Sequence, residues 1–200
     1  MSGRNSTRKV EGSTRGDRRP VVQHLPCSRS SSGTSRFAPR RPLIAHVKIR
    51  KARASEAEVL SALALQAKAH WGYSLETLES WKDQLRISSA DVASRPTYVG
   101  AINADIVGFY SLTPSGPVWE LDNLWVAPAF IHRGVGRKLI THALELAFRG
   151  GASSVTVDAD PNAEPFYLSC GATRRGEVPA PIPGQPNRVR PQLVFNGGTS

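Results

Sequence analysis

Residues 118–140 read, in order, as a strand, a glycine turn and the start of a helix, and this order limits the chain to folds in which helices pack on a sheet. The β-prone run ends at Pro128, and Gly134 and Gly136 form the turn. Apolar side chains then repeat with helical spacing until Gly150. An α/β architecture is therefore expected.

The turn at Gly134 and Gly136 has the properties of an anion-binding site. Glycine lets the backbone approach an anion without a Cβ in the way, and the first turn of a helix offers free N–H groups that favour phosphate. Arg133, Arg137 and Lys138 add positive charge at the same place. The segment lacks the Gly-Lys-Ser/Thr of a Walker A loop and the third glycine of a Rossmann fingerprint. It predicts a phosphate site of another kind, and a turn that serves packing alone is the alternative.

The remaining elements complete a mixed, mostly antiparallel sheet flanked by helices. The expected strands span 46–52, 97–102, 106–112, 118–126, 154–158, 172–178 and 188–195. The expected helices span about 55–70, 74–85, 136–148 and 161–170. Ser55 and Glu58 have the spacing of a capping box for the first helix, and Ser74 is placed to begin the second.

Charge separates the start of the chain from the rest. The 200 residues carry a formal net charge of +10. Residues 1–53 contain 14 basic and two acidic side chains, a net of +12, whereas the other 147 residues carry a net of −2. Residues 1–42 are also poor in apolar side chains, so they cannot offset their backbone entropy by burial. We expect a basic disordered tail over 1–42 and one domain over 43–200.

Three interpretations of the tail stay open: a solvated or start-site extension, a transit peptide rich in Arg and Ser, and a nucleic-acid-binding arm. Nucleic acid is not the expected partner, because the strong charge lies on the tail. No apolar run approaches the roughly 18–20 residues of a membrane span, and no secretory signal is recognisable. Cys27 and Cys170 lie in segments of different character. These features predict a cytoplasmic protein in a reducing compartment, without a membrane partner.

Two segments together resemble the GCN5-related N-acetyltransferase (GNAT) family. Residues 131–136 are similar to its motif Arg/Gln-x-x-Gly-x-Gly/Ala, although Ile131 stands where Arg or Gln is usual. Residues 162–172 are similar to its segment Asn-x-x-Ala-x-x-Phe-Tyr-x-x-x-Gly-Phe, shortened between Asn and Phe. The distance between the motifs and the order of elements also fit, over about 46–195. The resemblance implies the GNAT fold.

The resemblance further implies acetyl-CoA as the acyl-donor substrate, with no metal. Backbone N–H groups of the glycine turn would hold the pyrophosphate; these belong to His132, Arg133, Gly134, Val135, Gly136, Arg137 and Lys138. The strand at Leu124, Trp125 and Val126 would splay from its neighbour and pair with the pantetheine arm and the thioester carbonyl. Asn162 would hydrogen-bond the arm.

Direct transfer of the acetyl group to an amine is the implied reaction. Tyr167 would protonate the departing thiolate, with core packing as its alternative role. An alkylammonium must lose a proton before it attacks. Glu120 and Asp122 fall where family members carry a glutamate base or an aspartate that binds the amine, and strand alternation places residues 120, 122, 124 and 126 on one face. We expect Glu120 and Asp122 to act as the base, and ordinary surface acids are the alternative.

The acceptor wall is expected between the first two helices. The aromatic side chains of His70, Trp71 and Tyr73 would hold a cation or a flat group there. Asp158 and Asp160, after the strand at 154–158, would favour a cationic acceptor. A packed helix end and an ordinary strand end are the alternatives. No cluster of residues has metal-ligand spacing.

The sequence thus predicts an acetyl-CoA-dependent N-acetyltransferase acting on a primary amine of a small molecule. A protein N-terminus or a lysine is the alternative acceptor. A non-catalytic acyl-CoA-binding module with a nucleic-acid-binding tail is the alternative function. Family members often form dimers, so a homodimer is one of the open oligomeric states.

Overall fold

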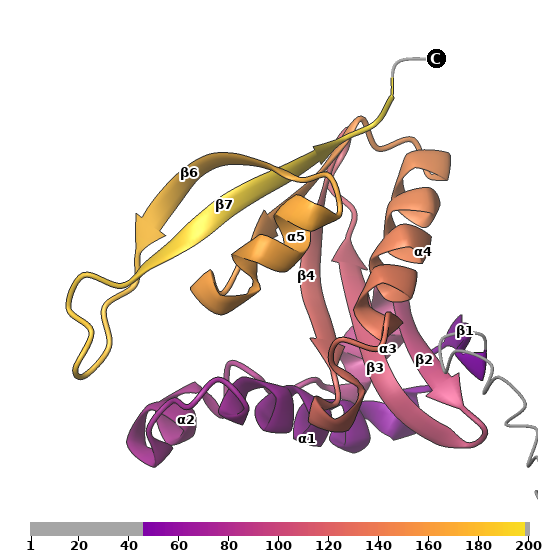
Figure 1. The fold of residues 1–200 in the computed structure, drawn as a ribbon. Helices are drawn as coiled ribbons and strands as arrows, with labels where there is room; N and C mark the ends of the chain where they lie inside the picture. The colour runs from indigo at the N-terminus through magenta and orange to yellow at the C-terminus, as the bar shows by residue number, and fades with distance from the viewer. Residues whose placement is uncertain (1–45, 199–200) are drawn as a thin grey trace, which may run out of the picture. The chain divides into compact units, whose positions relative to one another are not determined.

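A computed structural model describes residues 46–198, which form a seven-stranded sheet in the order β1-β2-β3-β4-β5-β7-β6 (Figure 1). The strands are β1 (Lys48–Lys51), β2 (Thr97–Ile102), β3 (Asp105–Thr113), β4 (Val118–Val126), β5 (Ser154–Asp158), β6 (Thr173–Pro179) and β7 (Val189–Asn196). The helices are α1 (Ala57–Ala69), α2 (Leu75–Trp81), α3 (Ser89–Ser94), α4 (Val135–Arg149) and α5 (Glu164–Ser169). Three short 3₁₀ turns are η2 (Ala54–Glu56), η3 (Pro128–Phe130) and η4 (Pro161–Ala163).

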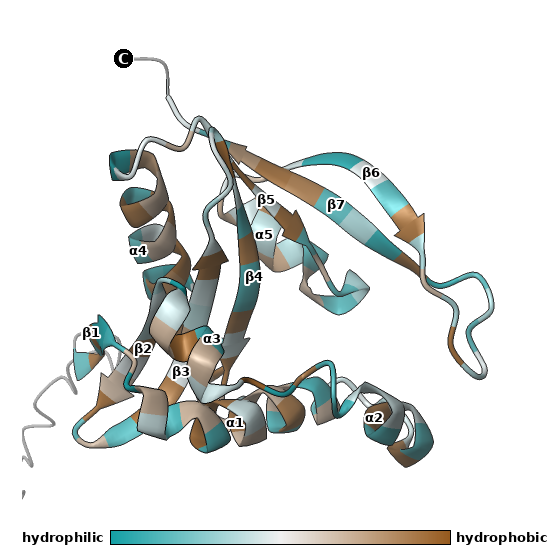
Figure 2. Cartoon of the chain, turned by 180° about the vertical axis from the view of Figure 1, so that it is seen from behind, coloured by the Kyte–Doolittle hydropathy of each residue, from teal (hydrophilic) through white to brown (hydrophobic). Residues whose placement is uncertain are grey.

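The expected mixed, mostly antiparallel sheet flanked by helices is confirmed. Only β4 and β5 run parallel; every other pair of neighbours is antiparallel. The tail over 1–42 and Cys27 lie outside the described residues. β6 is an edge strand whose residues are all exposed, and Figure 2 shows that most of it is hydrophilic, as a free sheet edge requires.

The two faces of the sheet carry separate hydrophobic clusters. On one face the apolar side of α4 packs against the central strands, through Leu139, Ile140 and Ala143. On the other face α1 packs through Leu60 and Leu63 against the middle of the sheet. The sheet is thus covered on both sides in its central part.

Local signals placed most elements within a few residues, but the start of the first helix differs. The first helix is entered through η2, where the Glu56 carboxylate accepts a hydrogen bond of 2.8 Å from the Arg53 backbone N–H. The expected capping box of Ser55 and Glu58 was therefore wrong. The second helix does begin after Ser74, whose side chain accepts from the Thr77 N–H at 3.2 Å.

A bulge in β4 changes the pattern of side chains along this strand. Ser111 of β3 pairs with Asn123, but the next residue, Leu112, pairs with Leu121, so Asp122 is the extra residue. A bulge reverses the alternation of side chains beyond it.

The expected single face for residues 120, 122, 124 and 126 was therefore wrong. Leu121, before the bulge, and Leu124, after it, both pack into the cluster under α4. Trp125 packs into the opposite cluster, under α1. Glu120 and Asp122 thus lie on the α1 side of the strand, away from the side that Leu124 presents.

β4 and β5 separate soon after they pair. Their register runs only from Val118 opposite Ser154 to Glu120 opposite Thr156. Beyond this point β4 continues alongside β3 to Val126, while β5 continues alongside β7 to Asp158. The predicted splaying of β4 is confirmed, and it leaves one edge of residues 121–126 without a strand partner.

Candidate active site

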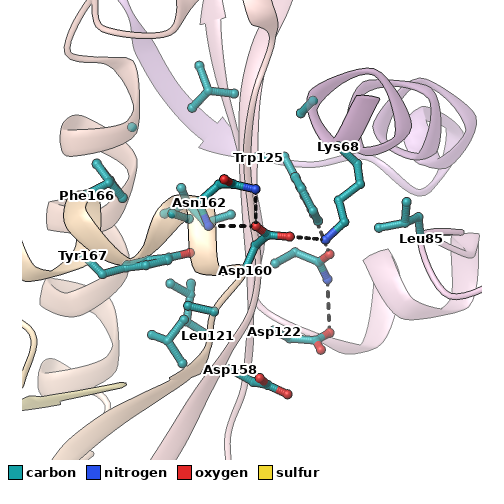
Figure 3. A pocket seen from close by; sticks show the side chains of 18 of the residues that line it. Lys68, Leu85, Leu121, Asp122, Trp125, Asp158, Asp160, Asn162, Phe166 and Tyr167 are labelled. Atoms are coloured by element: carbon teal, nitrogen blue, oxygen red, sulfur yellow. Dashed lines mark hydrogen bonds and ion pairs between the residues drawn. The ribbon is translucent and has the colours of Figure 1, made fainter. Parts of the chain in front are cut away.

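The splayed ends of β4 and β5 border a cavity of about 1220 Å³. Its walls come from the end of α1, α2, residues 121–126 of β4, the turn before α4, η4 with α5, and the loop after β6. Figure 3 shows Lys68 of α1, Asp160 before η4 and Tyr167 of α5 extending toward the same space.

One end of the cavity is formed by the N-terminus of α4. Gly134 precedes this 15-residue helix with φ of 80°, no side chain caps it, and its first turn has no acidic residue. The N–H groups of Val135, Gly136 and Arg137 are therefore without acceptors inside the helix, and the helix dipole adds positive potential. Gly134, Gly136 and Arg137 line the cavity. This end is suited to a phosphate group.

Two glycines of this turn are needed for different reasons. Gly134 adopts the left-handed conformation, which favours glycine. A Cβ on Gly136 would lie 3.2 Å from the Phe166 ring, because α5 packs closely against the start of α4. Packing, the alternative considered for the glycine turn, is thus a real function of Gly136, and it coexists with the open helix end.

The predicted phosphate-binding residues do not all face the cavity. His132 lines it, with φ of 59°. The Lys138 ammonium donates to the Val47 carbonyl at 2.5 Å, and Val135 is buried in the core. Arg133 lies over the Phe130 ring at 5.8 Å. Among the described residues, the last three contribute no side chain to the cavity lining.

Tyr167 packs in the core and also lines the cavity. Its ring is buried against Phe166 and Phe195, at centroid distances of 5.2 and 6.5 Å. Its hydroxyl points into the cavity (Figure 3) and makes no hydrogen bond within residues 46–198. Burial raises the pKa of Tyr167 and so keeps the phenol protonated. The side chain is thus a core residue with a free proton donor at its tip.

The two expected bases are in different positions. Asp122 lines the cavity, whereas Glu120 is not part of its lining. Asp122 Oδ2 forms an ion pair with Arg95 at 2.7 Å and accepts from the Asn123 amide at 3.1 Å. Its other oxygen, Oδ1, accepts no hydrogen bond from the described residues. Asp122 therefore presents one free carboxylate oxygen.

A charged cluster forms a part of the cavity wall between α1 and η4. We call it the Asp160 cluster; its members are Lys68, Tyr73, Asp160, Asn162 and Arg188. Asp160 Oδ2 accepts hydrogen bonds from the Lys68 ammonium at 2.5 Å, the Tyr73 hydroxyl at 2.8 Å and the Arg188 guanidinium at 3.2 Å. Asp160 Oδ1 accepts a hydrogen bond from the Asn162 side-chain amide at 3.0 Å. Burial alone would raise the pKa of Asp160, but the Lys68 ion pair and these hydrogen bonds outweigh it and lower the pKa.

The residues expected at the acceptor wall lie in different places in the structure: some line the cavity and others do not. Tyr73 belongs to the Asp160 cluster, as does Asn162, whose amide also donates to the Tyr73 hydroxyl at 3.1 Å. Trp71 lines the cavity. His70 packs edge-on against the Trp71 ring and is not part of the cavity lining. Asp158 lines the cavity and forms an ion pair with Arg190 at 2.6 Å.

Three side chains of the site had not been singled out. The sequence did contain a sign of Lys68's position. Helical spacing places Lys68 beside the buried Leu60, Ala64 and Ala67, on the packed side of α1. Arg95 and Arg188 had no such sign, because each meets its carboxylate only in the folded chain.

Within residues 46–198, no helix is long and apolar enough to cross a membrane. The same part of the chain holds no group of three or more His, Cys, Asp or Glu side chains arranged to bind a metal ion.

The model of the acetyltransferase (GNAT) family matches residues 61–172, which is more than half of the chain. The chain belongs to this family. A GNAT protein is an N-acetyltransferase, an enzyme that transfers acyl groups. The matched segment contains α4 with its open N-terminus, both splayed strands and Tyr167.

Solved structures share the GNAT fold over most of the chain. A GCN5-related N-acetyltransferase from Rhodopseudomonas palustris is 26% identical, with a TM-score of 0.63, over 75% of this chain and 95% of its own. The PaiA N-acetyltransferase from Thermoplasma acidophilum, in complex with coenzyme A, is 18% identical with a TM-score of 0.63, over 76% and 99%. The ribosomal-protein-S18-alanine N-acetyltransferase from Escherichia coli is 14% identical with a TM-score of 0.59, over 77% and 96%. No curated protein sequence matches.

Proposed function

We propose that this GNAT protein transfers the acetyl group of acetyl-CoA directly to the primary amine of a small molecule. The observation that carries the proposal is the open N-terminus of α4, which lies in the same cavity as the unpaired edge of β4 and the free hydroxyl of Tyr167. An anion site, an acyl-binding strand edge and a proton donor are thereby combined in one space. The Thermoplasma relative in complex with coenzyme A supports the choice of donor.

The donor would bind along the gap between β4 and β5. Its pyrophosphate would accept hydrogen bonds from the first N–H groups of α4, with Arg137 beside it. Its pantetheine arm would pair with the free edge of residues 121–126, as a strand would. Asn162 could reach the arm only by exchanging its present bonds to Tyr73 and Asp160. We therefore assign the arm mainly to the backbone of β4.

The reaction needs one base and one acid. The ammonium of the acceptor loses a proton, and the neutral nitrogen attacks the thioester carbonyl carbon. The carbon–sulfur bond breaks and the sulfur keeps its electron pair. Tyr167 gives its proton to the thiolate, and the nitrogen loses its second proton as the amide forms and restores the phenol. The net products are the acetylated amine, CoA and one proton released to water.

We assign the first deprotonation to Asp122. Asp122 lines the cavity, its Oδ1 accepts no hydrogen bond from the described residues, and the Arg95 ion pair holds the carboxylate through Oδ2. Glu120 lies on the same side of β4 but outside the cavity lining, so its reach to the acceptor is poorer.

Asp122→Asn should lower kcat/KM by about 10²- to 10⁴-fold, the usual contribution of a positioned base. Glu120→Gln should change it by less than about threefold, because small perturbations outside a site cost little. Both variants would be assayed for CoA release across pH. The assignment fails when the glutamine variant loses more activity than the asparagine variant.

The proposed function itself is tested by offering a panel of amines to the full chain with acetyl-CoA and following CoA release. We expect release that depends on a small amine and yields its acetyl amide by mass spectrometry. Release only with peptides would instead support a protein acceptor. Binding of acetyl-CoA without release for any amine would support a non-catalytic acyl-CoA-binding module.

A further inference from the structure

Each carboxylate that lines the cavity has a basic partner, and two of them, Asp91 and Asp122, share Arg95. Asp122 is paired with Arg95, Asp158 with Arg190, and Asp160 with Lys68 and Arg188. Asp91, which also lines the cavity, is paired with Arg95 at 3.1 Å. Within the described residues, no cavity carboxylate is left unpaired to receive the charge of a polycationic acceptor.

The Asp160 cluster carries an excess of positive charge. One carboxylate faces two cations, and all three side chains are nearly removed from water: 12% of Lys68, 9% of Asp160 and 4% of Arg188 is exposed. A buried charge without a counter-charge is costly. The rings of Tyr73 and Trp81 offset part of this cost, since the Lys68 ammonium lies 4.4 Å from the Trp81 centroid and Arg188 lies 5.4 Å from it.

The two cations also have unused hydrogen-bond donors. The Lys68 ammonium has three N–H bonds and donates one of them, to Asp160, among the described residues. The Arg188 guanidinium donates to Asp160, the Tyr73 hydroxyl and the Ala180 carbonyl. Its Nε–H is buried and has no acceptor in the described part of the chain. Native structures seldom leave such a donor unpaired.

We infer that the acceptor amine also carries a carboxylate, and that Lys68 and Arg188 bind this carboxylate. The inference rests on the proposed function and specifies its substrate class. The carboxylate would supply the missing counter-charge and accept the unused N–H bonds at the Asp160 cluster. The amine of the same molecule would then extend toward Asp122 and Tyr167, which Figure 3 shows on the same cavity as Lys68. The acceptor is thus an acidic or zwitterionic amine, in contrast to the cationic acceptor that Asp158 suggested in the sequence.

The test compares pairs of acceptors that differ only in the carboxylate: amino acids and other amino carboxylates against their amides. For the wild-type chain, we expect kcat/KM to be about 10- to 100-fold higher for the carboxylates, the range of one charged hydrogen bond. Lys68→Gln should raise KM more for the carboxylates than for the amides and so bring the ratio toward one. Lys68→Arg, which keeps the charge, should restore most of the preference.

A matched control is Lys82→Gln, directly after α2, where 59% of the lysine side chain is exposed; it should leave the ratio unchanged. Equal activity on each pair by the wild type, or a preference for the amides, would overturn the inference whether or not the Lys68 variants fold. Calorimetric titration with acetyl-CoA separates this from failure of the proposed function. Wild type and Lys68→Gln should bind acetyl-CoA equally, whereas a protein that neither binds it nor releases CoA refutes the enzyme mechanism.

Discussion

Asp160→Asn should lower the free energy of unfolding by about 3–5 kcal/mol, the range for breaking a buried ion pair. The change leaves the Lys68 and Arg188 charges buried side by side without their counter-charge. It also weakens the acceptor of the Tyr73 hydroxyl and the cap of η4, where Asp160 accepts from the Asn162 N–H at 2.9 Å. Urea denaturation of the full chain measures the loss.

Asp158→Asn is the matched control, because the ion pair of Asp158 with Arg190 is more open to water, with 29% and 45% of the two side chains exposed. Its loss should stay below about 1 kcal/mol. Equal losses for the two variants would contradict the account of the Asp160 cluster.

The Asp160 cluster should also make stability depend on acidity. The pKa of Asp160 is lower in the folded chain, so the unfolded chain takes up a proton first as the pH falls. The contribution of Asp160 is therefore complete above its unfolded pKa of about 4 and is lost as the pH falls toward the folded pKa. The urea midpoint of Asp160→Asn should consequently fall less between pH 5 and pH 3, roughly, than that of the wild type.

Tyr167→Phe should reduce kcat by about 10²- to 10⁴-fold and leave folding nearly unchanged. The phenylalanine ring keeps the contacts with Phe166 and Phe195, and the lost hydroxyl has no hydrogen bond within residues 46–198. Steady-state CoA release at saturating acetyl-CoA gives kcat, and calorimetry should show that the donor still binds.

Tyr110→Phe provides the comparison for this variant. Tyr110 is a buried tyrosine away from the cavity lining whose hydroxyl contacts His142 Nδ1 at 2.6 Å. Removing its hydroxyl should cost about 1 kcal/mol of stability, as for an ordinary hydrogen bond, and leave kcat unchanged. A Tyr167→Phe enzyme with the wild-type rate would reduce Tyr167 to its packing role.

The parts of the fold that local sequence signals determine were predictable. The strand before Pro128, the turn at Gly134 and the apolar face of α4 each depend on residues close together in the chain. The helix α3 was missed because it has six residues and buries only Val92, which is too little for a periodic pattern.

The side-chain arrangement of the site depended on contacts that the sequence does not display. The bulge at Asp122 has no local signature, yet it decides on which side of the sheet the side chains of β4 beyond it lie. Lys68 and Asp160 are 92 positions apart, and Asp160 and Arg188 are 28 apart. The charge of the Asp160 cluster depends on these long-range pairs, which the sequence does not display. The sequence alone therefore favoured a cationic acceptor.

A single-turnover experiment with acetyl-CoA labelled in its acetyl group tests direct transfer most directly. The full chain is mixed with labelled donor and an amino carboxylate, and the label is followed in the protein and in the small molecules. The account predicts that the label passes from CoA to the amide of the acceptor at the rate of CoA release, and never appears on the protein. Label bound covalently to the protein before it reaches the amine, or label that stays on CoA with every amine, would contradict it.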